Sequence, residues 1–82
     1  MKIKPLRKDL VNYLSAHNLS KKWKKVTLYF EENINHPSLN TELLEPHWRG
    51  IYSFRIDQKY RALFILADGE AEKFQITNHY KK

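Results

Sequence analysis

Two arginines and one histidine in the C-terminal half of the chain have the types and spacing that suggest chemistry. Arg55 and Arg61 lie in neighbouring strand-like segments, and His79 follows a third such segment near the chain end. In the strand register that the apolar pattern favours, the two arginines face each other across adjacent strands. Like charges placed in this way repel by a few tenths to about 1 kcal/mol. A bound phosphate would offset the repulsion, so the pattern predicts an anion site to which His79 adds a titratable group.

Three antiparallel strands are needed to position these residues. Alternation with period two predicts them at 51–56, 60–66 and 71–77, joined by three-residue turns at 57–59 and 67–69. The residues expected to face the core are Tyr52, Phe54, Ile56, Tyr60, Ala62, Phe64, Leu66, Phe74 and Ile76. They share one face only if both turns contain an odd number of residues, and Gly69 can supply a left-handed position in the second turn. The other face then carries Ser53, Arg55, Arg61, Leu63, Ile65, Gln75, Thr77 and His79.

The N-terminal half of the chain is predicted to be helical after a short strand at 2–4. One helix is expected at 6–17 and a second at 21–35, with Ser20 as its N-cap and His36-Pro37 at its end. The apolar stripe of the second helix consists of Trp23, Val26, Phe30 and Ile34. We therefore expect an α+β fold, a single domain over residues 1–82, with two N-terminal helices packed on one face of a small antiparallel sheet.

The composition narrows the possible functions. The chain has 82 residues and a net charge of +6. It has no cysteine, which excludes disulfides, thiolate metal sites and a cysteine nucleophile. No apolar stretch is long enough to span a membrane and the N-terminus has no signal core, so a cytoplasmic protein is expected. Lysines crowd the first turns of the second helix, where cations are unfavourable. They either contact a polyanion or form a solvated surface; they are Lys21, Lys22, Lys24 and Lys25.

The segment from residue 36 to residue 80 resembles the RelE/ParE superfamily of toxins from type II toxin–antitoxin systems. The resemblance rests on the ordered series Leu44, Gly50, Tyr52, Ser53, Arg55 and Ile56, on the Tyr60-Arg61 pair and on the terminal His79-Tyr80. These motifs are most similar to those of the YoeB branch, while the N-terminal helices match only in kind and order. The chain departs from that branch in the two lysines after Tyr80 and in the loop Glu45-Pro46-His47-Trp48-Arg49.

The resemblance implies a fold like that of microbial ribonucleases and a metal-independent endoribonuclease, an mRNA interferase that needs no cofactor. It implies that Glu42 is the general base, that Arg61 with Arg55 stabilises the phosphorane charge, and that His79 is the general acid. Tyr80 would stack on a base or orient the phosphate. Further phosphate contacts are expected from Lys59, Lys81 and Lys82, with disturbance of the terminus as the alternative for the last two. The lysines of the second helix would contact the ribosome.

The resemblance also implies partners, and it leaves alternatives open. A cognate antitoxin, the ribosome and mRNA are the expected partners, with operator DNA reached only through the antitoxin complex and no membrane partner. The alternatives are a non-enzymatic inhibitor of DNA gyrase, as in the ParE branch, and a decayed toxin that only binds antitoxin or operator DNA. Glu32 and His36 have a helical spacing that suits a metal, but no further ligand pair has suggestive spacing, so no metal site is expected.

Overall fold

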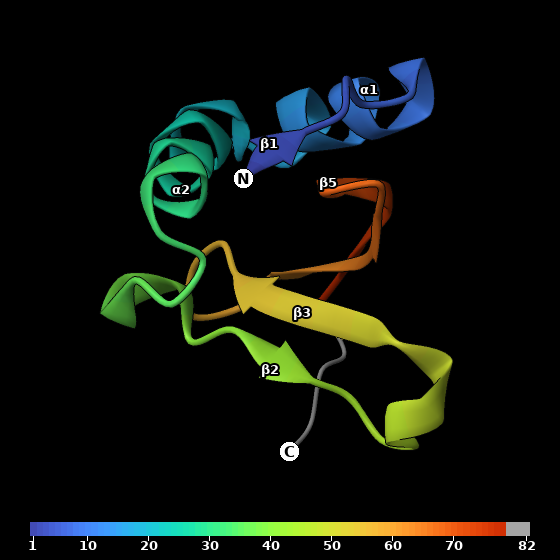
Figure 1. Ribbon diagram of the computed structural model, residues 1–82. Coiled ribbons are helices and arrows are strands. Elements are labelled where there is room, and N and C mark those ends of the chain that lie inside the picture. Colours follow the sequence, from blue (N-terminus) through green and yellow to red (C-terminus); the bar gives the residue numbers. More distant parts are fainter. Residues whose placement is uncertain (79–82) are drawn as a thin grey trace.

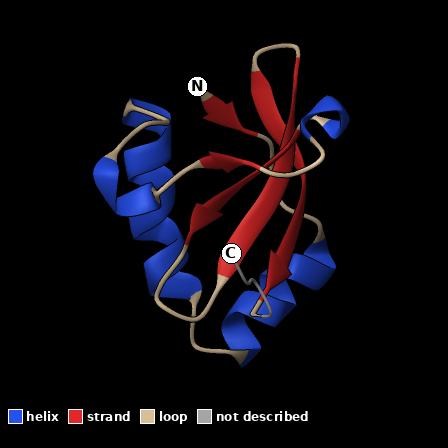
Figure 2. Cartoon of the chain, turned by 90° about the horizontal axis from the view of Figure 1, so that it is seen from below, coloured by secondary structure: helices blue, strands red, loops and turns tan. Residues whose placement is uncertain are grey.

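The computed structural model describes residues 1–78 and has two helices on one face of a five-stranded sheet (Figure 1). The elements are β1 (Lys2–Ile3), α1 (Lys8–Ala16), α2 (Ser20–Glu32), β2 (Glu42–Leu43), β3 (Ile51–Arg55), β4 (Arg61–Ala67) and β5 (Glu70–Thr77), with 3-10 turns η1 (Pro37–Leu39) and η2 (His47–Arg49). The strand order is β1-β5-β4-β3-β2, and every neighbouring pair is antiparallel except β1 with β5. Figure 2 shows the twist of this sheet from below. The predicted α+β class is confirmed, and neither described helix has the length and apolarity that crossing a bilayer requires.

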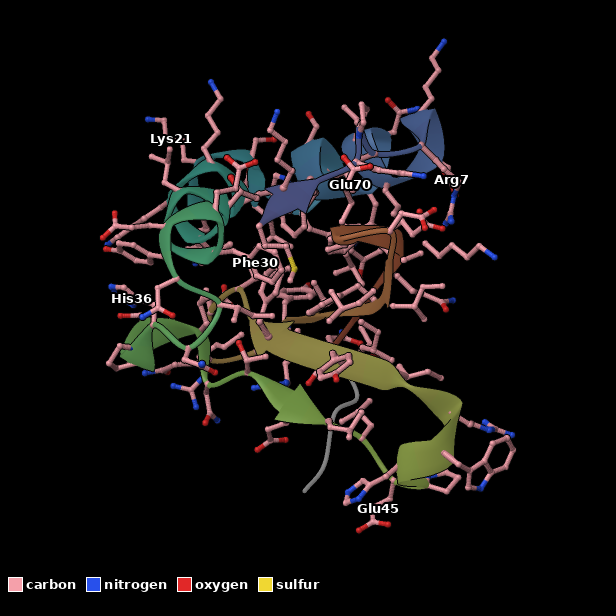
Figure 3. All side chains as sticks on the ribbon, viewed as in Figure 1. Arg7, Lys21, Phe30, His36, Glu45 and Glu70 are labelled. Carbon is pink, nitrogen blue, oxygen red and sulfur yellow. The ribbon has the colours of Figure 1, made fainter. Side chains whose placement is uncertain are left out.

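Aromatic side chains fill the layer between α2 and the sheet. Phe30 of α2 is fully buried, and its ring centroid lies 5.3 Å from that of Phe54 and 5.3 Å from that of Phe64 (Figure 3). Trp23, about two turns earlier on the same face of α2, stacks on Phe54 with ring centroids 5.7 Å apart. The apolar stripe expected from the helical spacing therefore forms the main contact between the helix and the sheet, and it fixes the position of β3 and β4.

The register of β3 and β4 follows the prediction. Tyr52 pairs with Phe64, Phe54 with Ala62, and Arg55 with Arg61. The Ile56 N–H donates to the Tyr60 carbonyl at 2.9 Å, so the turn between these strands contains the three residues 57–59.

The second hairpin corrects the prediction. Ala67 pairs with Glu70, so its loop has two residues, Asp68 and Gly69, both at positive φ, as a tight type I′ turn requires. An even loop would turn the side chains of β5 to the wrong face. A bulge in β5 compensates, because the register shifts between Leu63 and Ile65 and Lys73 adopts a left-handed φ of 56°. Phe74 and Ile76 therefore still pack against the core as predicted.

Several element boundaries also differ from the prediction. α1 is shorter at both ends, and α2 begins at Ser20 with Leu19 at the N-cap position and no side-chain cap. α2 ends at Glu32 because Asn33 turns to extended backbone, and His36 caps η1 instead of closing the helix. The strand β2 was not anticipated, since its two residues carry no detectable period.

Candidate functional site

The sheet face opposite the helices carries the described candidate residues. Register places Glu42 beside Ser53 on β3, and Ser53 beside Leu63 on β4. The next row consists of Arg55, Arg61 and Thr77, on β3, β4 and β5. A third row, at the other end of these strands, is apolar and half-buried; it contains Leu44, Ile51 and Ile65. Polar and apolar rows thus lie side by side on one face.

Arg61 is buried on this face and held by defined acceptors. Arg61 is 5% exposed, and its Nε donates to Ser53 Oγ at 3.0 Å. Its Nη2 donates to the same hydroxyl at 2.8 Å, to the Ser53 carbonyl at 3.3 Å and to the Asn40 carbonyl at 2.8 Å. The Ser53 and Asn40 acceptors are neutral oxygens, and they hold the guanidinium in one orientation. A cation fixed in this way is pre-organised for an anion, because little reorganisation is needed on binding.

The connector between α2 and β2 positions Glu42 and Asn40. Leu39 is fully buried and anchors η1 in the core, while His36 stacks on Tyr29 with ring centroids 4.0 Å apart. His36 Nδ1 accepts the Ser38 N–H at 3.1 Å. The Thr41 hydroxyl then donates to the Ile34 carbonyl at 2.7 Å, directly before Glu42. This connector therefore places a carboxylate on the face that holds the two arginines.

The turn that carries the chain from Arg55 to Arg61 is closed by Asp57. Its Oδ1 accepts the N–H groups of Lys59 and Tyr60, each at 2.8 Å, and its Oδ2 accepts from Lys22 Nζ at 2.8 Å. Partial burial raises the pKa of Asp57, but the hydrogen bonds from Lys22 and the two backbone groups outweigh it and lower the pKa below its usual value. The paired arginines are thus set by a charge-assisted turn. Arg55 itself is exposed.

Within residues 1–78, the lysines with predicted contacts do not converge on this face. Lys59 Nζ lies 5.7 Å from the centroid of the Tyr60 ring, which belongs to the helix-covered core. Figure 3 shows Lys21 on the outside of α2, on the far side of the sheet from Glu45. Lys22 is engaged with Asp57, and Lys25 Nζ lies 6.0 Å from the Tyr29 ring centroid. The lysines of α2 therefore form a surface separate from the candidate site.

Some candidates were predicted and others were missed. His79, Tyr80, Lys81 and Lys82 lie outside the described residues, so their placement beside the arginines stays a prediction. Sequence reasoning missed the role of Ser53, although it belongs to the motif before Arg55, and that of Asn40. Asn40 has a left-handed φ of 47°, and the tolerance of asparagine for that conformation is the signal that could have marked it. In the described part of the chain, no group of three or more potential metal ligands forms around Glu32 and His36.

No protein-family model matches the chain, and no curated protein is similar enough in sequence to be matched.

Proposed function

We propose that this protein is the toxin of a type II toxin–antitoxin system and cleaves mRNA on the ribosome. The observation that carries the proposal is Arg61, buried and held by Ser53 and Asn40, paired with the exposed Arg55 on the face that also carries Glu42. Two arginines in register repel unless an anion lies between them, and a phosphodiester is an anion of suitable geometry. The motif resemblance supplies the biological setting, in the cytoplasm with an antitoxin as inhibitor.

The proposed reaction is a transesterification at phosphorus. Glu42 takes the proton from the ribose 2′-hydroxyl, whose oxygen forms a bond to phosphorus. Arg61 and Arg55 stabilise the negative charge that develops on the phosphorane oxygens. The bond from phosphorus to the 5′-oxygen breaks, and His79 gives that oxygen a proton. The products are a 2′,3′-cyclic phosphate and a 5′-hydroxyl, and no metal takes part.

The test is primer extension on one mRNA incubated with antitoxin-free protein, with and without translating ribosomes. Discrete cuts in the coding region that need translation are the expected result. Glu42→Gln and Arg55→Ala should each reduce cutting at least tenfold. A positioned acid–base group contributes about 10²–10⁴-fold, and one group that stabilises transition-state charge contributes about 10²–10³-fold. Both side chains are partly or fully exposed, so the fold should survive.

Arg7→Ala is the matched control for the loss of one positive charge. Arg7 is exposed, pairs with Asp9 and lies on the helical side of the molecule (Figure 3). Its substitution should leave cleavage unchanged. Intact RNA from a folded wild-type protein, with or without ribosomes, would contradict the proposal and favour gyrase inhibition or a decayed toxin.

A further inference from the structure

Trp48 is the most exposed large apolar side chain in the described part of the chain. It is 82% exposed at the centre of η2, whereas Trp23, the other tryptophan, is half-buried and stacks on Phe54. Exposing an indole forgoes the gain from burying one of the largest apolar side chains. None of the η2 residues is buried, so packing within the chain does not account for this position.

The turn that presents Trp48 is well defined. The Arg49 N–H donates to the Pro46 carbonyl and the Gly50 N–H to the His47 carbonyl, each at 3.1 Å. Gly50 then ends the turn at a φ of 67°, a backbone conformation that residues other than glycine and asparagine rarely adopt. Binding a ligand at a turn held in this way loses less conformational entropy than ordering a free loop.

A cation accompanies the indole. Arg49 Cζ lies 5.6 Å from the centroid of the Trp48 ring, within the range of a cation–π contact. Glu45, on the same turn, lies beside His47, whose Nε2 is 3.7 Å from the Glu45 Oε1. An aromatic plane backed by a guanidinium is the arrangement on which single-stranded nucleic acids stack their bases, since every base has a π-face and every nucleotide a phosphate.

The position of η2 connects it with the candidate site. In Figure 1, η2 projects beyond the start of β3, on the side of the sheet away from the helices, and η1 lies at the opposite end. Arg55 ends β3, so about 13 Å of strand separates it from Ile51 at the η2 end. The half-buried row of Leu44, Ile51 and Ile65 lies between. A single strand bound at the arginines can reach Trp48 within a few nucleotides.

We propose that Trp48, with Arg49 behind it, is a stacking site for an unpaired base of the RNA strand whose phosphate lies at Arg55 and Arg61. The inference rests on the proposed function and deepens it. The site positions the strand without reading its sequence, because stacking tolerates every base. RNA is favoured over a protein partner because the same face carries Arg55 and Arg61, and because the whole chain has a net charge of +6.

The experiment uses binding as its readout, so that it does not depend on cleavage. A six-nucleotide 2′-O-methyl RNA, which cannot be cleaved, is titrated into the protein while the two indole N–H signals are followed by NMR. Trp48→Phe assigns the signals, and Trp23 is the internal control. The expected result in the wild type is a saturable shift of the Trp48 signal only. The affinities of the variants, which lack that signal, are measured by fluorescence anisotropy of a labelled copy of the same oligonucleotide. The affinity should fall about tenfold in Trp48→Ala and be largely restored in Trp48→Phe.

Two outcomes would overturn the inference. The first is the absence of a saturable Trp48 response, which would favour a protein partner, not RNA, as the ligand of the indole. The second is an equal response to an abasic oligonucleotide of the same length, which would show contact by charge alone. Primer extension on the same variants separates this failure from that of the proposed function. If Trp48→Ala cleaves as well as the wild type, and RNA does not shift the Trp48 signal of the wild type, only the stacking site is rejected. If RNA shifts that signal but no cleavage occurs, the nuclease is rejected.

Discussion

The two faces of the sheet are made by alternate residues of the same strands, yet they are buried in different ways. On the helix-covered face, Phe54 and Phe64 pack against Phe30 with ring centroids 5.3–5.6 Å apart. On the other face, Ser53 and Arg61 are buried and joined by directional hydrogen bonds. Aromatic packing stabilises the fold without needing a ligand, whereas burying a guanidinium is unfavourable unless it is fully bonded. The first face is therefore held by packing, and the second by directional hydrogen bonds around a buried charge, as the proposed phosphate site requires.

The largest expected effect is on the aromatic face. Phe64→Ala removes a ring that contacts three other phenylalanines, and it should destabilise the protein by about 3–5 kcal/mol. Domains have a free energy of unfolding of roughly 5–15 kcal/mol, and small domains lie near the lower end. A substantial fraction of the variant should therefore be unfolded even without denaturant. Urea denaturation followed by circular dichroism measures the change. A loss below 1 kcal/mol would mean that Phe64 does not belong to the principal core.

The aromatic face was also the part most open to prediction from sequence. Period two in β3 and β4 and helical spacing in α2 report burial directly, so the sequence alone predicts that Phe30, Phe54 and Phe64 lie in the core. The pairing of Arg55 with Arg61 followed from the same register. The two-residue turn was open to prediction, because Asp68-Gly69 is a sequence typical of a type I′ hairpin. The bulge was not, because no local pattern marks the left-handed backbone of Lys73. The anchoring of Arg61 to Asn40 joins residues far apart in sequence, which periodicity does not detect.

The polar face should show a smaller loss of stability with a larger loss of activity. Ser53→Ala removes the hydroxyl that accepts from Arg61 Nε and Nη2, and it should cost about 1–3 kcal/mol because a buried charged group loses an acceptor. Cleavage in the primer-extension assay should fall by more than the loss of folded protein explains, because Ser53 no longer holds the Arg61 guanidinium in place. Thr27→Ala is the control: its hydroxyl bonds only the exposed Lys24 carbonyl. Equal effects of the two substitutions on cleavage would remove the distinction between the faces.

The turn between the two arginines should make stability depend on pH. The pKa of Asp57 is lowered in the folded protein, so its carboxylate contributes stability above the unfolded pKa, near 3.9, and loses it as pH falls through the folded pKa. Asp57→Asn should therefore cost about 1 kcal/mol at neutral pH, and the difference from wild type should disappear as the pH falls below the lowered pKa of Asp57. Thermal unfolding from pH 2 to pH 7 measures it. Asp68→Asn, which removes an exposed charge from the other turn, should show no such acid dependence; a matching dependence would exclude a specific role of Asp57.

The smallest expected change in stability is a gain, whereas the preceding ones are losses. It bears most directly on the comparison of the two sheet faces. Arg55→Gln relieves the repulsion with Arg61 across the β3–β4 pair, so it should stabilise the protein by a few tenths to about 1 kcal/mol. Added salt should reduce this gain, because it screens the same repulsion in the wild type. Cleavage should fall in the same variant, because a cation that meets the phosphate is lost. A substitution that strengthens the fold and weakens the reaction identifies a position kept for its ligand, not for stability. Destabilisation by Arg55→Gln at every salt concentration would instead show that the arginine pair supports the sheet itself.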